Sequence, residues 1–218
     1  MPAEPTLKAE NINTPGYWDG VYRQEWESGC VQGGNYHRDY APIHDAVIGL
    51  IADGNSVLDI ACGAGLLCRK IKQRLPSTQV FGVDFAQYTI EKNQKEDRSL
   101  GVEYRCLDIR NSLSSLDRKF DVVMMCEILE HLDEPEKIVQ EALGLLKAGG
   151  RFILTCPHND EIPDPEHVGF WGHDEVFHLL APFSDTISLV HFPPPYFHIW
   201  MMAYLTKKQP ENNGGPAE

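Results

Sequence analysis

Short apolar runs alternate with amphipathic segments through the centre of the chain. The runs are rich in valine, isoleucine and phenylalanine and predict five buried strands: Ser56–Ile60, Gln79–Asp84, Glu103–Asp108, Phe120–Cys126 and Arg151–Cys156. The segments between them carry apolar residues at helical spacing and predict three helices: Leu66–Leu75, Ala86–Asp97 and Pro135–Lys147. Because parallel strands are joined by right-handed helical crossovers, this alternation predicts a mostly parallel sheet with helices on both faces.

The two ends of the chain depart from this alternation. Before the first strand, amphipathic patterns predict helices at about Pro15–Gly29 and His37–Ala52. After the fifth strand, the long polar connection Pro157–Gly172 leads to a short helix near Asp174–Leu180. We interpret residues 1–53 as a helical lid region.

Two further strands are predicted near the C-terminus, at Thr186–Phe192 and His198–Thr206. The connection between them, Pro193–Phe197, is too short for a helical crossover, so the strands should pair antiparallel. The predicted fold class is therefore α/β, with a seven-stranded, mostly parallel sheet that ends in an antiparallel hairpin. Residues 54–206 form the main domain, and residues 207–218 are predicted to be a disordered tail.

Composition narrows the range of partners. The chain has 218 residues, enough for one sizeable core, and carries 19 Lys and Arg against 32 Asp and Glu, a net charge of −13. Such a field repels nucleic acid and anionic membranes, which favours a small-molecule substrate. No apolar run approaches the roughly 20 residues of a membrane span, and no secretory signal precedes the domain, so we expect a cytoplasmic monomer or homodimer. The six cysteines form no C-x-x-C pair and are expected to be free thiols.

A glycine turn marks the candidate ligand site. The stretch Val57–Gly65 reads V-L-D-I-A-C-G-A-G, an apolar run that reaches a carboxylate and passes directly into the turn. The next predicted strand ends on Asp84. Carboxylates at the tips of successive parallel strands, with glycines where a backbone approaches a ligand closely, are typical of a nucleotide-type site at the carboxyl edge of a sheet.

These residues resemble the class I S-adenosylmethionine-dependent methyltransferases, which have a Rossmann-like fold with the same terminal hairpin. The resemblance covers about Val57–Thr206 and makes residues 54–206 the cofactor-binding domain. Val57–Gly65 is similar to the family's first motif, Asp84 matches the acid that takes the ribose hydroxyls, and Asp108 matches the acid near the adenine amino group. Ala61 stands where the family often has glycine. The cofactor-binding residues implied by the resemblance are Asp59, Ala61, Gly63, Gly65, Asp84, Phe85, Asp108, Ile109 and Cys126.

Two other interpretations fit these residues less well. A nicotinamide oxidoreductase would need the dinucleotide-binding motif G-x-G-x-x-G, but Cys68 stands at the third glycine position. A nicotinamide cofactor would also leave Asp59 without a ligand group to bind. A non-catalytic partner protein with the methyltransferase fold would have no need of intact Asp59, Asp84 and Asp108. The sequence therefore favours S-adenosylmethionine as the cofactor and an active methyltransferase as the function, most readily on a hydroxyl oxygen.

Chemistry on the acceptor side is predicted after the fourth strand, in Cys126-Glu127-Ile128-Leu129-Glu130-His131-Leu132. If the chain turns helically there, Glu127, Glu130 and His131 face the same way, toward the substrate side of the cleft. Two carboxylates and an imidazole suit Mg²⁺, Mn²⁺, Fe²⁺ or Zn²⁺. With His167 from the later loop, this E-x-x-E-H arrangement resembles the ubiquinone-biosynthesis O-methyltransferases and the small-RNA 2′-O-methyltransferases. The resemblance implies Glu127, Glu130, His131 and His167 as metal ligands.

An active site without a metal is the alternative that these residues leave open. In that case His131 and His167 are the two candidate general bases, because the pKa of a histidine near neutrality suits removal of a hydroxyl proton. Aromatic residues of the N-terminal helices, together with the loop Asn159–Trp171, are predicted to cover the acceptor. Those expected to touch it are Tyr17, Trp18 and Tyr40.

Overall fold

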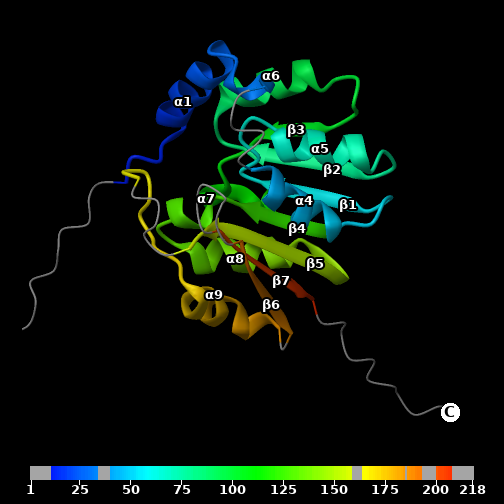
Figure 1. Ribbon diagram of the computed structural model, residues 1–218, viewed down its shortest axis with the longest axis vertical. Coiled ribbons are helices and arrows are strands. Elements are labelled where there is room, and N and C mark those ends of the chain that lie inside the picture. The colour runs from blue at the N-terminus through cyan, green and yellow to red at the C-terminus, as the bar shows by residue number, and fades with distance from the viewer. Residues whose placement is uncertain (1–10, 34–39, 159–163, 185, 193–199, 208–218) are drawn as a thin grey trace, which may run out of the picture.

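A seven-stranded sheet runs through the computed structural model, which describes residues 11–33, 40–158, 164–184, 186–192 and 200–207 (Figure 1). The strand order is β3-β2-β1-β4-β5-β7-β6. The strands are β1 Ser56–Ile60, β2 Gln79–Asp84, β3 Glu103–Cys106, β4 Phe120–Cys126, β5 Leu146–Pro157, β6 Ile187–Phe192 and β7 Trp200–Thr206. The first five are parallel, and β7 pairs antiparallel with both β5 and β6. The predicted fold class and the terminal hairpin are confirmed.

Helices cover both faces of the sheet because successive strand residues alternate between two apolar cores. One core joins Val57 and Met124 to α4, α5 and α6, and the other joins Leu58 and Met125 to α8 and α9. The helices are α1 Pro15–Glu27, α2 Cys30–Gly33, α4 Ala41–Gly49, α5 Leu66–Arg74, α6 Gln87–Glu96, α7 Ile109–Ser112, α8 Pro135–Gly144 and α9 His173–Leu180. Three short 3₁₀ turns cover Leu113–Ser115, Leu129–His131 and Ala181–Phe183.

Several predicted boundaries were wrong. The helix predicted over Pro135–Lys147 ends at Gly144, and β5 already begins at Leu146, which pairs with the first residue of β4 ahead of a register shift. The apolar period continues through this junction, so the pattern alone could not locate it. The third strand stops at Cys106 because Asp108 caps α7 and its side chain accepts a hydrogen bond from the Arg110 N–H.

The N-terminal helices are shorter than predicted. Helix α1 ends at Glu27, and Gly29 beyond it has a φ of +76°. Helix α4 begins at Ala41, and the start predicted at His37 lies outside the described residues. Figure 1 shows α1 and the yellow connection that precedes α9 on the same side of the sheet.

Further expectations concern the cysteines, membrane-spanning helices and the domain limits. All six cysteines are free, as predicted. Within the described part of the chain, no helix has the length and apolar character that crossing a membrane requires. The domain limits at residues 53 and 206 remain predictions, and the predicted tail lies outside the described residues except for Lys207.

Candidate active site

The glycine turn after β1 requires left-handed backbone at three positions. The φ angles are +59° at Ala61, +49° at Gly63 and +72° at Gly65, and the last of these is the N-cap of α5. Glycine adopts this conformation without a steric penalty, which explains two of the three residues. A Cβ on Gly63 would lie 2.7 Å from the Tyr22 hydroxyl oxygen. Helix α1 therefore packs directly over the turn.

Two buried carboxylates flank this turn. Asp84, at the end of β2, accepts backbone hydrogen bonds from the Gly63 and Ala86 N–H groups, each at 2.9 Å. Burial raises its pKa to about 6, and the backbone donors oppose that rise. Asp59 accepts a hydrogen bond from the Cys68 thiol at 3.2 Å, and burial raises its pKa to about 7. Both carboxylates are thus held by neutral donors.

A narrow pocket opens beside Asp84. Its walls come from the ends of β1, β2 and β4, from α7 and from the N-terminal segment, and they are mostly apolar. The lining residues are Asn13, Ala61, Asp84, Phe85, Leu107, Asp108, Ile109, Arg110, Ile128, His131 and Leu132. Five of the nine predicted cofactor residues are in this set. The other four, which are not among the lining residues, are Asp59, Gly63, Gly65 and Cys126.

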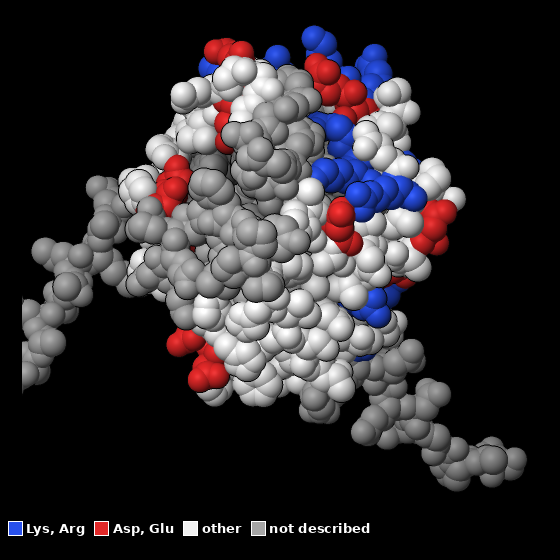
Figure 2. Space-filling view, in the orientation of Figure 1, with Lys and Arg blue, Asp and Glu red and all other residues white. Residues whose placement is uncertain are grey.

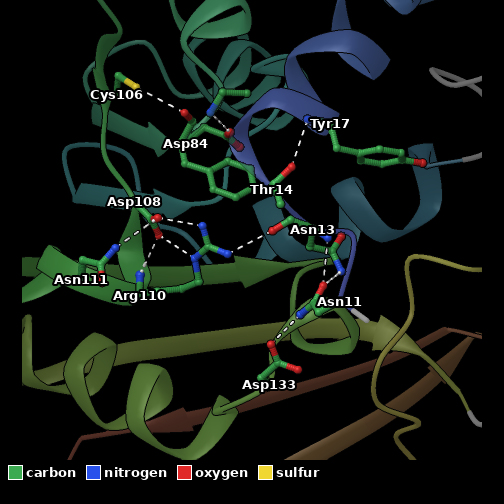
Figure 3. Close-up of polar contacts among 12 residues, drawn as sticks. Asn11, Asn13, Thr14, Tyr17, Asp84, Cys106, Asp108, Arg110, Asn111 and Asp133 are labelled. Carbon is green, nitrogen blue, oxygen red and sulfur yellow. Dashed lines mark hydrogen bonds and ion pairs between the residues drawn. The ribbon is translucent and has the colours of Figure 1, made fainter. Parts of the chain in front are cut away.

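The sequence interpretation did not include Arg110 and Asn13, which meet across this pocket (Figure 3). The Arg110 guanidinium binds both oxygens of Asp108, at 2.8 and 2.7 Å, and lies 5.1 Å from the ring centre of Phe85. It also donates to the Asn13 carbonyl at 3.0 Å. The ion pair lowers the pKa of Asp108. The spacing of two residues between Asp108 and Arg110 was a usable signal for the ion pair, whereas nothing local indicated Asn13.

A second, open pocket lies between α1, the carboxyl ends of β4 and β5, and the connection before α9. Its lining is aromatic and acidic: Trp18, Val21, Tyr22, Glu25, Tyr40, Glu127, Glu130, His131, Pro157, Asp164, Glu166 and His167. His131 lines this pocket and the narrow one. One potential ligand atom from each of Glu130, His131 and His167 lies within 4.8 Å of the other two. The structure therefore brings three of the four predicted metal ligands together.

The His131 imidazole has a fixed tautomer. Its Nδ1 lies 3.1 Å from the Glu166 carbonyl oxygen, which can only accept, so Nδ1 carries the proton and donates it. The Nε2 lone pair is then free on the opposite side of the ring, 3.8 Å from Glu130 Oε1. Burial lowers the pKa of His131 to about 4. A neutral imidazole held by a carbonyl is the form that binds a metal, and so low a pKa makes a weak base near neutrality.

Glu130 and Glu127 line the same wall of the open pocket but differ in their hydrogen bonding. Glu130 is 3% exposed, and its Oε2 has no hydrogen-bond partner among the described residues. Burial, followed by the nearby Glu127 charge, raises the pKa of Glu130 well above its ordinary value. Glu127 has a left-handed φ of +54° and accepts a hydrogen bond from the Thr155 hydroxyl at 2.7 Å. The helical turn that was expected to align all three residues covers only Leu129–His131.

The aromatic residues predicted to touch substrate separate into two groups. Trp18 and Tyr40 line the open pocket, and the Trp18 ring lies 5.4 Å from the His131 ring, edge to face. Tyr17 is outside the lining and is 36% exposed, and its hydroxyl donates to the Glu166 carboxylate. Tyr17 therefore contacts the loop that holds His131 and His167 rather than the pocket itself.

The glycine turn, the paired carboxylates and the antiparallel β7 can be compared with known families. Residues 58–154 match the family model described as "Methyltransferase domain". Residues 58–154 therefore carry a methyltransferase domain. This domain accounts for the position of the narrow pocket at the carboxyl edge of β1 and β2 and supports the methyl-donor interpretation over the nicotinamide one.

Curated relatives and solved structures agree with this domain. The chain is 33% identical over 142 residues to the ubiquinone biosynthesis O-methyltransferase of Coxiella burnetii (strain Dugway 5J108-111), a match covering 63% of this chain and 58% of that protein. Its counterpart in Idiomarina loihiensis is 34% identical over 126 residues, 54% of this chain and 51% of that one. The chain thus spans little more than half the length of these two relatives.

The solved structures share the fold of the methyltransferase domain. The plantazolicin methyltransferase BpumL in complex with S-adenosylhomocysteine has a TM-score of 0.64 at 16% identity, covering 88% of this chain and 94% of that one. The PH0226 protein of Pyrococcus horikoshii OT3 has a TM-score of 0.67 at 21% identity, covering 82% and 93%. Sequence identities this low establish the architecture alone.

Proposed function

We propose that this chain transfers the methyl group of S-adenosylmethionine to a hydroxyl oxygen of a small aromatic acceptor with vicinal oxygens, assisted by a divalent ion. The observation that carries the proposal is the position of His131, which lines both pockets. A group shared by two pockets lies within reach of a donor in one and an acceptor in the other, the proximity that methyl transfer requires. The names of the relatives, O-methyltransferases of ubiquinone biosynthesis, support oxygen as the acceptor atom.

The donor occupies the narrow pocket in this proposal. Asp84, oriented by two backbone N–H groups, takes the ribose hydroxyls, and Phe85 and Ile109 contact the adenine. The methionine portion lies over the glycine turn, where its ammonium group faces the buried Asp59. The positive charge of the donor is matched by Asp59 and Asp84, neither of which forms a salt bridge with a cationic side chain among the described residues.

The buried floor of the open pocket fits a divalent ion. The clustered ligand atoms of Glu130, His131 and His167, the unpartnered Glu130 Oε2 and the free Nε2 of His131 together form a donor set for Mg²⁺, Mn²⁺, Fe²⁺ or Zn²⁺. Glu127, on the same wall, is the fourth proposed ligand. When bound, such an ion lowers the pKa of an acceptor hydroxyl and orients vicinal oxygens.

The chain's own residues then hold the acceptor in line with the methyl group of the donor. The acceptor oxygen forms a bond to the methyl carbon as the carbon–sulfur bond breaks, and the sulfur keeps the electron pair of that bond. The acceptor proton passes to water, because His167 is already assigned to the ion. Trp18 and Tyr40 cover the acceptor ring and exclude water from the sulfonium.

Turnover measured with and without metal tests this function. The protein is treated with a chelator, freed of it, and assayed with S-adenosylmethionine and 4-methylcatechol or 4-methylphenol. We expect methylation of the catechol only, a loss of more than about 100-fold in the metal-free protein, and recovery with Mn²⁺ or Zn²⁺. Calorimetry should show S-adenosylhomocysteine binding in both forms. Undiminished turnover in chelator would refute the metal, and absence of binding heat would refute the donor.

A further inference from the structure

The open pocket holds more negative charge than a metal site needs. Its described lining includes five carboxylates, from Glu25, Glu127, Glu130, Asp164 and Glu166, and no Lys or Arg is among these described residues. A divalent ion on the floor would offset two of these charges. The remaining field opposes any acceptor that carries a carboxylate or phosphate and favours one that carries a positive charge.

The carboxylates at the rim are separate from the proposed metal ligands. Glu25 comes from α1 and Glu166 from the connection before α9, and both are partly exposed, whereas Glu130 lies buried at the inner end. Among the described residues, no cationic side chain forms a salt bridge with Glu25. Burial and the neighbouring Glu166 raise the pKa of Glu25 to about 7, as expected for a carboxylate without a countercharge.

An unpartnered carboxylate oxygen also lies on the wall of this pocket. Glu130 Oε2 is fully buried on the pocket wall and has no hydrogen-bond partner among the described residues. A buried carboxylate oxygen left in this state is costly unless a ligand satisfies it. The proposed ion satisfies this oxygen, and Glu25 and Glu166 are not among the proposed ligands of that ion.

Aromatic rings lie on the same side as these rim carboxylates. Trp18 and Tyr22 share α1 with Glu25 and line the pocket beside it, and Tyr40 adds a third ring. Ring faces next to carboxylates are the usual means by which proteins bind an ammonium group, through cation–π attraction and charge-assisted hydrogen bonds. Tyr17 orients Glu166 by donating a hydrogen bond to it.

We propose that Glu25 and Glu166 form an ammonium-binding subsite, so that the methyl acceptor is an aromatic vicinal diol carrying a basic amine. This inference rests on the proposed function, because it specifies which acceptor the same pocket selects. The diol lies at the buried floor and the ammonium group lies between the two rim carboxylates. Glu25 is then a specificity-determining residue for the acceptor.

Matched catechols test the subsite on the full chain. Dopamine carries an ammonium group, 4-methylcatechol is neutral and 3,4-dihydroxyphenylacetate carries a carboxylate. We expect kcat/KM to fall in that order, with dopamine at least about tenfold above the carboxylate compound. In Glu25→Gln this preference should shrink about tenfold through a higher KM for dopamine. The control Glu27→Gln, on the exposed side of the same helix, should keep the preference.

A binding assay separates failure of the subsite from failure of the proposed reaction. Phenethylamine and phenylacetate are titrated against the S-adenosylhomocysteine complex, without any turnover. Tighter binding of phenethylamine that Glu25→Gln abolishes supports the subsite even if no catechol is methylated, in which case the proposed reaction alone fails. Equal binding of the two compounds, or equal losses for all three catechols in Glu25→Gln, would overturn the subsite. Methylation of the dopamine nitrogen would also overturn it, because the amine would then face the donor.

Discussion

The narrow pocket, proposed for the donor, and the open pocket, proposed for the acceptor, both contain carboxylates, but the charges of these carboxylates are compensated differently. On the donor side, Asp84 is held by two backbone N–H groups and Asp108 by the Arg110 guanidinium. On the acceptor side, Glu130 Oε2 has no partner among the described residues, and no described cation pairs with Glu25. Backbone N–H groups and Arg110 compensate the first site without a ligand, whereas the proposed function requires ligands that bring positive charge to the second.

The sharpest test of this contrast is His131→Ala. If the acceptor side depends on a bound ion, removal of the Nε2 ligand should lower kcat about 1000-fold and abolish stoichiometric metal binding. Affinity for S-adenosylhomocysteine should change by less than about threefold, because the donor is held by backbone and by Asp84. Steady-state kinetics, metal analysis and calorimetry measure the three quantities.

His178→Ala is the control, since His178 is exposed on α9 and lines neither pocket. It should behave as the parent protein does. A kcat for His131→Ala within a few-fold of the parent would refute His131 as a ligand of a catalytic ion.

The converse variant, Asp84→Ala, should affect the donor side alone. Loss of a fixed acceptor for two ribose hydroxyls should weaken S-adenosylhomocysteine binding about 100-fold, while metal content stays unchanged. Calorimetry and metal analysis on the same preparation distinguish these effects. The control Asp45→Ala removes an exposed carboxylate paired with Arg74 on the far helices. If Asp84→Ala retains parental affinity, the narrow pocket does not hold the ribose.

The affinity of the donor side for S-adenosylhomocysteine should depend on pH. Burial raises the pKa of Asp59 to about 7, so in the ligand-free protein this carboxyl stabilises the fold at low pH and loses that contribution as pH rises through about 7. A ligand ammonium needs the ionised form. S-adenosylhomocysteine affinity should therefore fall as pH drops below 7, by roughly tenfold per unit, and level off above it.

Calorimetry between pH 6 and 8 measures this slope, and buffers of different ionisation enthalpy should reveal proton release on binding. Asp59→Asn should flatten the profile in this range. An affinity that is constant with pH in the parent protein would place the ammonium group away from Asp59.

The sequence supported the donor side better than the acceptor side, for a physical reason. Strand ends and glycine turns are local patterns, so Asp84 and Gly65 could be assigned from residues next to them in the chain. The acceptor side is assembled from α1, β4 and a later loop, and its contacts join residues as distant as His131 and Glu166. Glu25 lies on a helix whose pattern was visible, but nothing local indicated that it would line the same pocket as Glu130. The left-handed backbone at Glu127 likewise depends on its hydrogen bond to β5 and not on its neighbours.

The smallest expected effect comes from Tyr17→Phe, which acts on the acceptor side through the loop. The Tyr17 hydroxyl donates to the Glu166 carboxylate, and the Glu166 carbonyl accepts from His131 Nδ1. Since the side chain is 36% exposed, loss of this bond should lower the free energy of unfolding by less than about 1 kcal/mol and raise KM for the acceptor about twofold. S-adenosylhomocysteine affinity should not change. The Glu166 hydrogen bond raises the pKa of Tyr17 to about 12, so the effect should be constant across neutral and mildly alkaline pH.

Tyr88→Phe, on α6 outside both pockets, is the control. A change in donor affinity with an unchanged acceptor KM would assign Tyr17 to the other side of the site.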